Sequence, residues 1–257
     1  MVSFSTRVLR IERYLIPAGL LILTVVAWVV LYWQSGMMDS QAMGLTMGMS
    51  ALLFLAIWVV MMIAMMFPAS VPIVLAFNKV HASRHPQDHP FVPAWIFIGS
   101  YLLLWSLCGI IAYLLAVGSD QLAAHFMWLT DNGARLSGGI LLLAGLYQFS
   151  PIKYVCLGQC CNPSQFVEDS WHDGYGGAFR MGLAHGRYCL GCCWFLFVIL
   201  FPLGIMNLVV MALITVFIFA EKVLPGGRLL SKLAGAGLAI YGLLIIFMPA
   251  ILSRAGM

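Results

Sequence analysis

Long apolar stretches with almost no charged residues constrain the fold of this chain more than any other feature of its sequence. Seven can be placed, at about residues 15–33, 51–77, 92–117, 136–150, 178–201, 205–221 and 230–251. A helix needs about 20 apolar residues to cross a bilayer, and tilting accommodates moderate differences in length. Only 9% of the residues are charged, against about 25% in soluble domains. The sequence therefore predicts an all-α fold, a polytopic transmembrane helical bundle of about seven helices that forms one domain over residues 1–257.

Basic residues predict the orientation of this bundle. Arg7, Arg10 and Arg13 precede the first apolar stretch, which is longer than the roughly 7–15 apolar residues of a signal peptide and lacks a clear cleavage site. We therefore expect a retained helix with its N-terminus inside. This choice also puts most lysines and arginines of the connecting loops inside, as the positive-inside rule requires. Because the net charge of +4 is spread over these loops, the expected partner is the lipid bilayer, and a nucleic acid is not expected.

Prolines and glycines mark where the helices bend or end. Pro68 and Pro72 predict a kink in the second helix, whereas Pro202 and Gly204 predict a tight break between the fifth and the sixth. The longest connection covers residues 151–177 and is expected to be a loop on the inside. No soluble domain fits between the helices, so chemistry is expected within the bundle or in this loop.

Six of the seven cysteines lie in two similar runs, KYVCLGQCCNP and RYCLGCCW. The first run is predicted to begin the inside loop, and the second lies on the fifth helix near mid-membrane. There, His185, Cys189 and Cys192 follow one another at i, i+4 and i+7, with Cys193 alongside, so they form one stripe on one face. Two near-copies of a cysteine triplet are hard to attribute to packing, which is the expected role of the isolated Cys108.

A second group of soft donors lies on the second helix in WVVMMIAMMFP, where Met62 and Met66 share a face. Thiolates, thioethers and imidazoles are the ligands that Cu(I) prefers, and thiolates with imidazole also suit zinc or an iron–sulfur cluster. The sequence therefore predicts a bound metal ion, copper before zinc or iron–sulfur. The predicted ligands are Cys156, Cys160, Cys189, Cys192, Cys193, His185, Met62 and Met66.

The two triplets can form one site or two. One face of a helix supplies only part of a metal ion's coordination shell, so a closed site needs donors from another element. We expect Cys156 and Cys160 to fold back towards the fifth helix through a re-entrant turn, which Pro151 and Gly158 permit. The sequence thus predicts one composite site rather than two separate ones.

Other polar residues carry weaker signals. His81, His85 and His89 recur at intervals of four, but two of them are followed by proline, so a solvated loop is the simpler interpretation. Glu221 and Lys222 are expected to form a pair at the membrane surface. No phosphate-binding loop, catalytic triad or zinc-protease motif occurs, so catalytic residues stay unknown and it is open whether the protein is an enzyme.

Taken together, the motifs resemble those of a known family. WVVMMIAMMFP, KYVCLGQCCNP and GRYCLGCCWFL, followed by MNL and EK, occur in this order between Trp58 and Lys222, and the pattern is similar to a bacterial family of predicted metal-binding integral membrane proteins. The resemblance implies a multi-pass protein of the bacterial inner (cytoplasmic) membrane that binds a metal ion. In that family an arginine takes the place of Cys161, so Cys161 is left out of the predicted ligand set.

Functions of three classes are compatible with these features. The leading hypothesis is a membrane protein that binds, buffers or passes Cu(I) through cysteine, methionine and histidine ligands. The alternative is a redox-active membrane protein, either a thiol–disulfide exchanger or the membrane subunit of a copper- or quinone-linked oxidoreductase. The third is a structural subunit whose cysteines only pack. Other membrane or periplasmic subunits are compatible partners for each of these.

Overall fold

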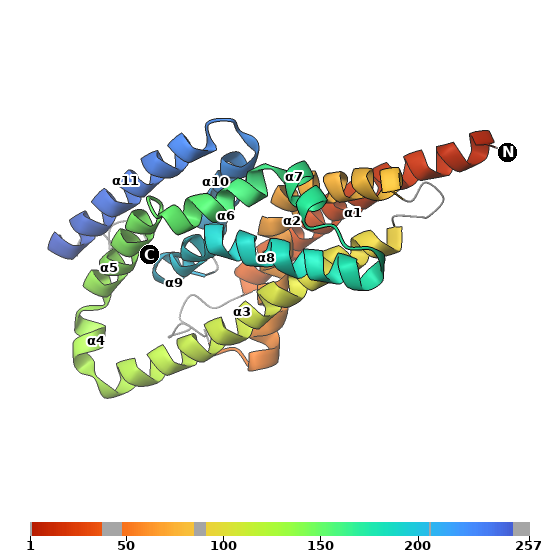
Figure 1. Cartoon of the computed structure of the whole chain (residues 1–257). Coiled ribbons are helices and arrows are strands. Elements are labelled where there is room, and N and C mark those ends of the chain that lie inside the picture. The colour runs from red at the N-terminus through yellow and green to blue at the C-terminus, as the bar shows by residue number, and fades with distance from the viewer. Residues whose placement is uncertain (1, 38–47, 85–90, 206, 249–257) are drawn as a thin grey trace.

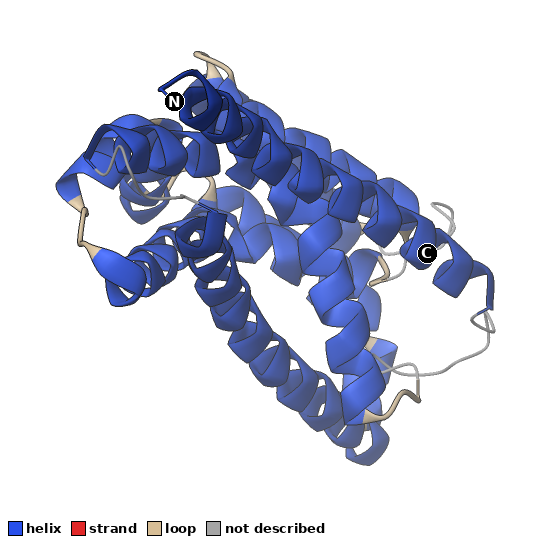
Figure 2. Ribbon diagram, turned by 90° about the vertical axis from the view of Figure 1, so that its right-hand side faces the viewer, coloured by secondary structure: helices blue, strands red, loops and turns tan. Residues whose placement is uncertain are grey.

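The computed structural model describes residues 2–37, 48–84, 91–205 and 207–248, and within them every regular element is a helix (Figure 1). Figure 2 shows the same molecule turned by 90°, with long helices lying side by side. The prediction of an all-α bundle is confirmed. In chain order the helices are α1 (Val2–Met37), α2 (Ala51–Arg84), α3 (Phe91–His125), α4 (Met127–Asp131), α5 (Gly133–Tyr147), α6 (Pro151–Cys161), α7 (Pro163–Asp169), α8 (Gly174–Val198), α9 (Leu200–Leu203), α10 (Leu208–Val223) and α11 (Gly227–Phe247).

The described helices include five that are long and apolar enough to cross a membrane. They are Leu15–Gly36 of α1, α2, most of α3, α8 continued through α9, and α11. A sixth results if α5 and α6, which meet at an angle of 62°, count as one broken span. The predicted span at 205–221 corresponds to α10, whose 16 residues extend over only ~24 Å at 1.5 Å per residue. The total of seven and the orientation in the membrane therefore stay predictions.

Two buried clusters hold the helices together. The larger one joins α2, α3, α6, α8 and α10 and contains the cysteines of α8. The smaller one forms around Phe77, Phe97 and Phe166, where the C-terminal half of α2 meets α3, α7 and α8. Large apolar side chains cover the outer faces of α1, α3 and α11, which a protein in water rarely exposes over such an area. These outer faces suit contact with lipid.

Helix α2 continues unbroken past both of its prolines. A proline lacks the N–H group that would bind the carbonyl four residues earlier, so Pro68 leaves the carbonyl of Ala64 without its helical donor. The indole Nε1 of Trp28 on α1 donates to that oxygen at 3.1 Å. A side chain from the neighbouring helix thus replaces the missing bond, and α1 is fixed against the middle of α2.

The predicted inside loop at 151–177 is wrong for most of its length, because the structure forms α6 and α7 there. Ser150 accepts a hydrogen bond from the backbone N–H of Ile152 as the N-cap of α6, and Pro151 occupies its first turn. Both are common signals for the start of a helix. Helix α6 then packs against α8. The predicted break after the fifth helix is confirmed, since α9 ends before Gly204, which adopts a φ of +94°.

Candidate metal centre

Three cysteines of α8 bring their sulfur atoms together. Cys189, Cys192 and Cys193 have Sγ atoms that all lie within 4.8 Å of one another, and each residue is at most 1% exposed. The Sγ atoms of Cys192 and Cys193 are 3.2 Å apart. Positions i, i+3 and i+4 lie on one face of a helix, and this face points into the larger buried cluster. We call these three residues the cysteine triad.

Groups from three other helices surround Cys189. The hydroxyl oxygen of Tyr101 on α3 lies 3.2 Å from its Sγ atom, and the Nζ atom of Lys222 on α10 donates to it at 3.1 Å. The thioether sulfur of Met66 on α2 is 3.9 Å away. Cys189 is therefore the point at which α2, α3, α8 and α10 converge. Its surroundings combine one soft donor, one hydroxyl and one positive charge.

The lysine beside the triad corrects the sequence analysis. Glu221 and Lys222 were expected to pair with each other, but Lys222 reaches Cys189 while Glu221 binds Lys153 at 2.7 Å. Consecutive helical residues point about 100° apart, so α10 presents Glu221 to α6 and Lys222 to α8. Cys189 and Lys222 must also lie at nearly the same depth, although one was placed at mid-membrane and the other at the surface. A buried ammonium needs an anionic partner, and a thiolate at Cys189 would supply one.

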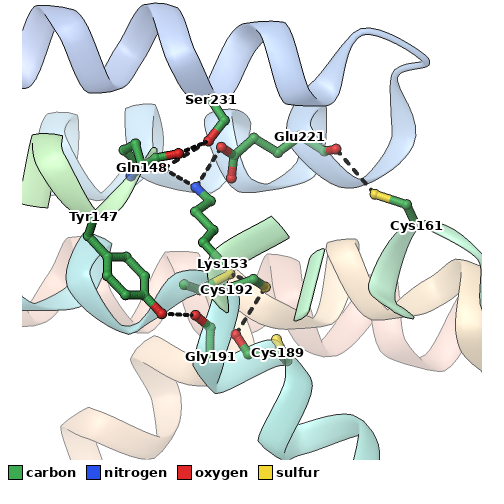
Figure 3. A network of polar contacts seen from close by, with 10 residues as sticks. Tyr147, Gln148, Lys153, Cys161, Cys189, Gly191, Cys192, Glu221 and Ser231 are labelled. Carbon is green, nitrogen blue, oxygen red and sulfur yellow. Dashed lines mark hydrogen bonds and ion pairs between the residues drawn. The ribbon is translucent and has the colours of Figure 1, made fainter. Parts of the chain in front are cut away.

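A buried polar network lies next to the triad and fixes α6 (Figure 3). Lys153 donates to the side-chain oxygen of Gln148 and to Glu221, and neither Lys153 nor Glu221 is more than 1% exposed. Ser231 on α11 donates to the same oxygen of Gln148 at 3.1 Å. These contacts connect α6 with α10, α11 and the turn after α5. The positive charge of Lys153 and the negative charge of Glu221, both buried in this apolar region, are thereby paired with each other.

The first cysteine triplet comes to lie beside the second. Cys160 on α6 is buried in the same cluster as the triad and interacts with Cys192. Cys156 packs against Gly191 so closely that a Cβ atom at Gly191 would lie 2.5 Å from its Sγ atom. Cys161 turns away and donates to the backbone carbonyl of Glu221 at 3.6 Å. Two of the three thiols on α6 thus face the α8 turn that carries the triad.

His185 lies one turn before the triad and outside its sulfur cluster. Its ring stacks on Phe97 and Tyr101, with centroid distances of 5.9 and 5.4 Å, and Phe166 packs against it edge-on. Neither ring nitrogen has a hydrogen-bond partner among the described residues. The stripe predicted from helical spacing is present, but its histidine end is enclosed by aromatic rings.

The remaining sequence candidates are spread over the structure. Met62 is fully buried in the larger cluster, one turn before Met66. Cys108 is half-buried on α3 and is not part of the sulfur cluster. His81 ends up in the last turn of α2, whereas His85 and His89 lie outside the described residues. Of the methionines predicted as ligands, Met66 contacts the triad.

Comparison with known proteins identifies a family for this chain. Residues 55–245 match the model of the PpoB2 family, which is described as a copper chaperone family. No significant similarity was found to curated proteins or to solved structures. The matched residues cover well over half of the chain and include the triad, Lys222, the α6 cysteines and Met66. This chain therefore belongs to the PpoB2 family of copper chaperones.

Proposed function

We propose that this protein is a membrane copper chaperone that holds Cu(I) between the thiolates of the cysteine triad. The observation that carries the proposal is the convergence of three buried sulfur atoms within 4.8 Å. Thiolate and thioether ligands favour Cu(I), and the family assignment names copper independently. Burial protects a bound Cu(I) ion from water, which suits a protein that carries the ion rather than one that uses it in solution.

The number of donors favours copper over the other metals considered from the sequence. Structural zinc sites take four ligands in a tetrahedron, and common iron–sulfur clusters are held by four cysteines. The triad offers three sulfurs within 4.8 Å of one another on one helix face, and Cys160 is not part of that group. The sulfur of Met66 lies 3.9 Å from Cys189 Sγ, which is farther than the hydrogen-bonding groups around Cys189. Cu(I) accepts a lower coordination number, so the triad alone is sufficient for it.

The positive charge of Lys222 favours a site occupied by thiolates. A Cu(I) ion bound by two or more thiolates carries a net negative charge, which is costly in an apolar interior unless a cation lies nearby. The ammonium of Lys222 is 3.1 Å from Cys189 Sγ and provides that cation. Lys222 therefore compensates the charge of the loaded site without being a ligand.

The α6 thiols give the bound ion a route out of the triad. Cu(I) moves between proteins or sites by ligand exchange, which requires a second thiol close to the first. Cys160 interacts with Cys192, and Cys156 lies on the opposite side of the same turn of α8 at Gly191. We infer one composite site, with Cys160 as the acceptor for an ion leaving the triad and Cys156, one turn earlier on α6, as the next thiol after it. Met66 is a candidate further donor, and His185 and Met62 belong to the surrounding shell.

Copper stoichiometry in matched cysteine variants tests this proposal. The full-length protein and the variants Cys189→Ser, Cys192→Ser and Cys108→Ser are purified in detergent and titrated with Cu(I) against a chromophoric competitor. Loss of the tight copper site is expected for Cys189→Ser and Cys192→Ser. Retention is expected for Cys108→Ser, because the thiol of Cys108 on α3 is not part of the sulfur cluster. Full copper binding by both triad variants would refute the proposal.

A second function rests on the proximity of two thiols. The Sγ atoms of Cys189 and Cys192 lie within 4.8 Å of each other, and two such thiols oxidise reversibly to a disulfide by exchange with a partner's disulfide, which is reduced to two thiols. Thiol titration of metal-free protein before and after reductant distinguishes this function from copper carriage. A redox role predicts a reversible change of two thiols per chain, whereas copper carriage alone predicts no change.

A further inference from the structure

A long groove runs along the outer side of α8, on the face away from the triad. It has a volume of about 870 Å³ and lies between α3, α5 and α8. One wall is α3 from Trp105 to Ser119, and the other is α8 and its continuation into α9, from Arg187 to Phe201. Figure 1 shows α3 leading away towards α4 while α8 leads to α9. The groove lies where these two helices diverge.

The two walls run in the same direction, which fixes the two ends of the groove. Gly182 packs on Phe97 and Ser100, and one turn later Gly186 packs on Tyr101 and Leu104. Both helices therefore advance together along the contact. The groove begins near Arg187 and ends near Phe201, ~21 Å farther along at 1.5 Å per residue. This length is comparable to that of one extended acyl chain.

Polarity is concentrated at one end of the groove. Arg187 is the charged residue of the lining, and the other lining residues are mostly apolar or aromatic. At the far end the hydroxyl group of Ser119 already donates to the carbonyl of Leu115 at 2.7 Å. The groove thus has one cation at the end formed by Arg187 and a mostly apolar surface along the rest of its length.

Arg187 has no counter-ion in the part of the chain that the structure describes. Its side chain is exposed beside the groove, within a helix that is apolar enough to cross a membrane. A charged residue in such a segment normally faces a partner, because an uncompensated charge among lipid chains is costly. A guanidinium group binds phosphate through two parallel hydrogen bonds. A phosphate group is therefore a fitting partner for Arg187.

We propose that this groove binds one anionic phospholipid from the bilayer, with its phosphate at Arg187 and an acyl chain along α3 and α8. Access from the bilayer is open, because Ile111 and Leu115 in the wall are 58% and 65% exposed. A zwitterionic lipid such as phosphatidylethanolamine is less suitable, since no acidic side chain lines the groove to pair with its ammonium group. The selectivity for an anionic headgroup follows from this difference.

The lipid site shares a turn of α8 with the triad. Gly191 lines the groove between two residues of the cysteine run, and its carbonyl accepts a hydrogen bond from Tyr147 at 2.5 Å. A lipid bound in the groove therefore packs against the side of α8 opposite Cys189 and Cys192, at the same helix turn. The lipid site does not depend on copper binding and is tested separately from it.

Native mass spectrometry of the full-length protein in detergent tests the lipid site. The protein is titrated with phosphatidylglycerol and phosphatidylethanolamine that have identical acyl chains, and the first bound lipid is quantified. Both lipids offer Arg187 a phosphate, so the preference measures the difference in headgroup charge: phosphatidylglycerol keeps one net negative charge beside Arg187, whereas the ammonium of phosphatidylethanolamine cancels it. We expect a preference for phosphatidylglycerol of about tenfold or more and its loss in Arg187→Gln.

Two further variants separate a specific site from general charge and from misfolding. Arg180→Gln removes an exposed arginine of the same helix outside the groove and is expected to keep the preference. Ala112→Trp fills the groove while leaving Arg187 in place, and it is expected to lose the first tightly bound lipid. Equal affinity for both lipids in the unmodified protein, or equal effects of Arg180→Gln and Arg187→Gln, would overturn the proposal. So would tight lipid binding by Ala112→Trp.

Discussion

Replacing Lys222 by methionine removes the positive charge beside the triad and keeps most of the side chain's volume. In the metal-free protein Cys189 can stay protonated and neutral, so it needs no positive charge beside it. In the copper-bound protein the cysteine ligands are thiolates, so the negative charge remains. The cost of the missing charge therefore falls mainly on the loaded protein. We expect Lys222→Met to weaken Cu(I) binding while the metal-free protein stays folded.

The size of this effect follows from the distance and the burial. At 3.1 Å between Lys222 Nζ and Cys189 Sγ, two unit charges interact by about 5 kcal/mol at an effective dielectric constant of ~20. Removing one partner of a buried ion pair typically costs about 3–5 kcal/mol. Because bound copper withdraws part of the thiolate's charge, the lower end of this range applies, which corresponds to an increase of about 100-fold in the Kd for Cu(I).

Competition titrations with a Cu(I) chromophore measure this Kd directly. Lys222→Arg keeps the charge and is expected to retain most of the affinity, and Lys232→Met removes an exposed lysine of α11 and is expected to change nothing. An unchanged Kd in Lys222→Met would mean that the loaded site carries no negative charge, and the thiolate site proposed here would then be wrong.

Three further predictions concern stability and the coordination shell. Lys153→Met leaves the carboxylate of Glu221 buried without its partner and is expected to lower the unfolding free energy by about 3–5 kcal/mol. Combining Lys153→Met with Glu221→Leu is expected to recover most of this loss. Thermal unfolding in detergent measures both variants, and equal stabilities of the single and the double variant would contradict the reasoning. Gly145→Ala brings a Cβ atom to 2.6 Å from the backbone of α11 and is expected to cost about 1–3 kcal/mol, while Gly139→Ala, which meets no atom within 4 Å, is expected to be neutral or stabilising. Met66→Leu is expected to raise the Kd for Cu(I) about tenfold with little change in Tm, because an isosteric core substitution costs less than about 1.5 kcal/mol; an unchanged Kd would exclude Met66 as a donor.

The sequence was sufficient for the features that depend on local pattern. The long apolar stretches predicted most of the long helices. Helical spacing placed Cys189, Cys192 and Cys193 on one face, and in the structure their sulfur atoms lie within 4.8 Å of one another. The helix at 151–161 was missed although Ser150 and Pro151 are a usual start signal, because these residues lie between the apolar stretches assigned as membrane spans and were treated as a connection.

Contacts between distant parts of the chain could not be predicted from the local sequence pattern. Lys222 meets Cys189 across 33 positions, and Lys153 meets Glu221 across 68. Their side chains are buried because α10 lies beside both α6 and α8, and no spacing rule within α10 indicates which of these helices each residue faces. A lysine at the end of an apolar helix signals only that some anionic partner is needed.

X-ray absorption spectroscopy at the copper K-edge tests most directly whether the triad holds Cu(I). The protein is loaded with one Cu(I) ion per chain, and its spectrum is compared with that of Cys189→Ser loaded in the same way. We expect a Cu(I) edge and a first shell made only of sulfur in the unmodified protein, and a shell that loses sulfur or a sample that holds no copper in the variant. A first shell dominated by nitrogen or oxygen, or identical spectra for the two proteins, would contradict a copper site built on the cysteine triad.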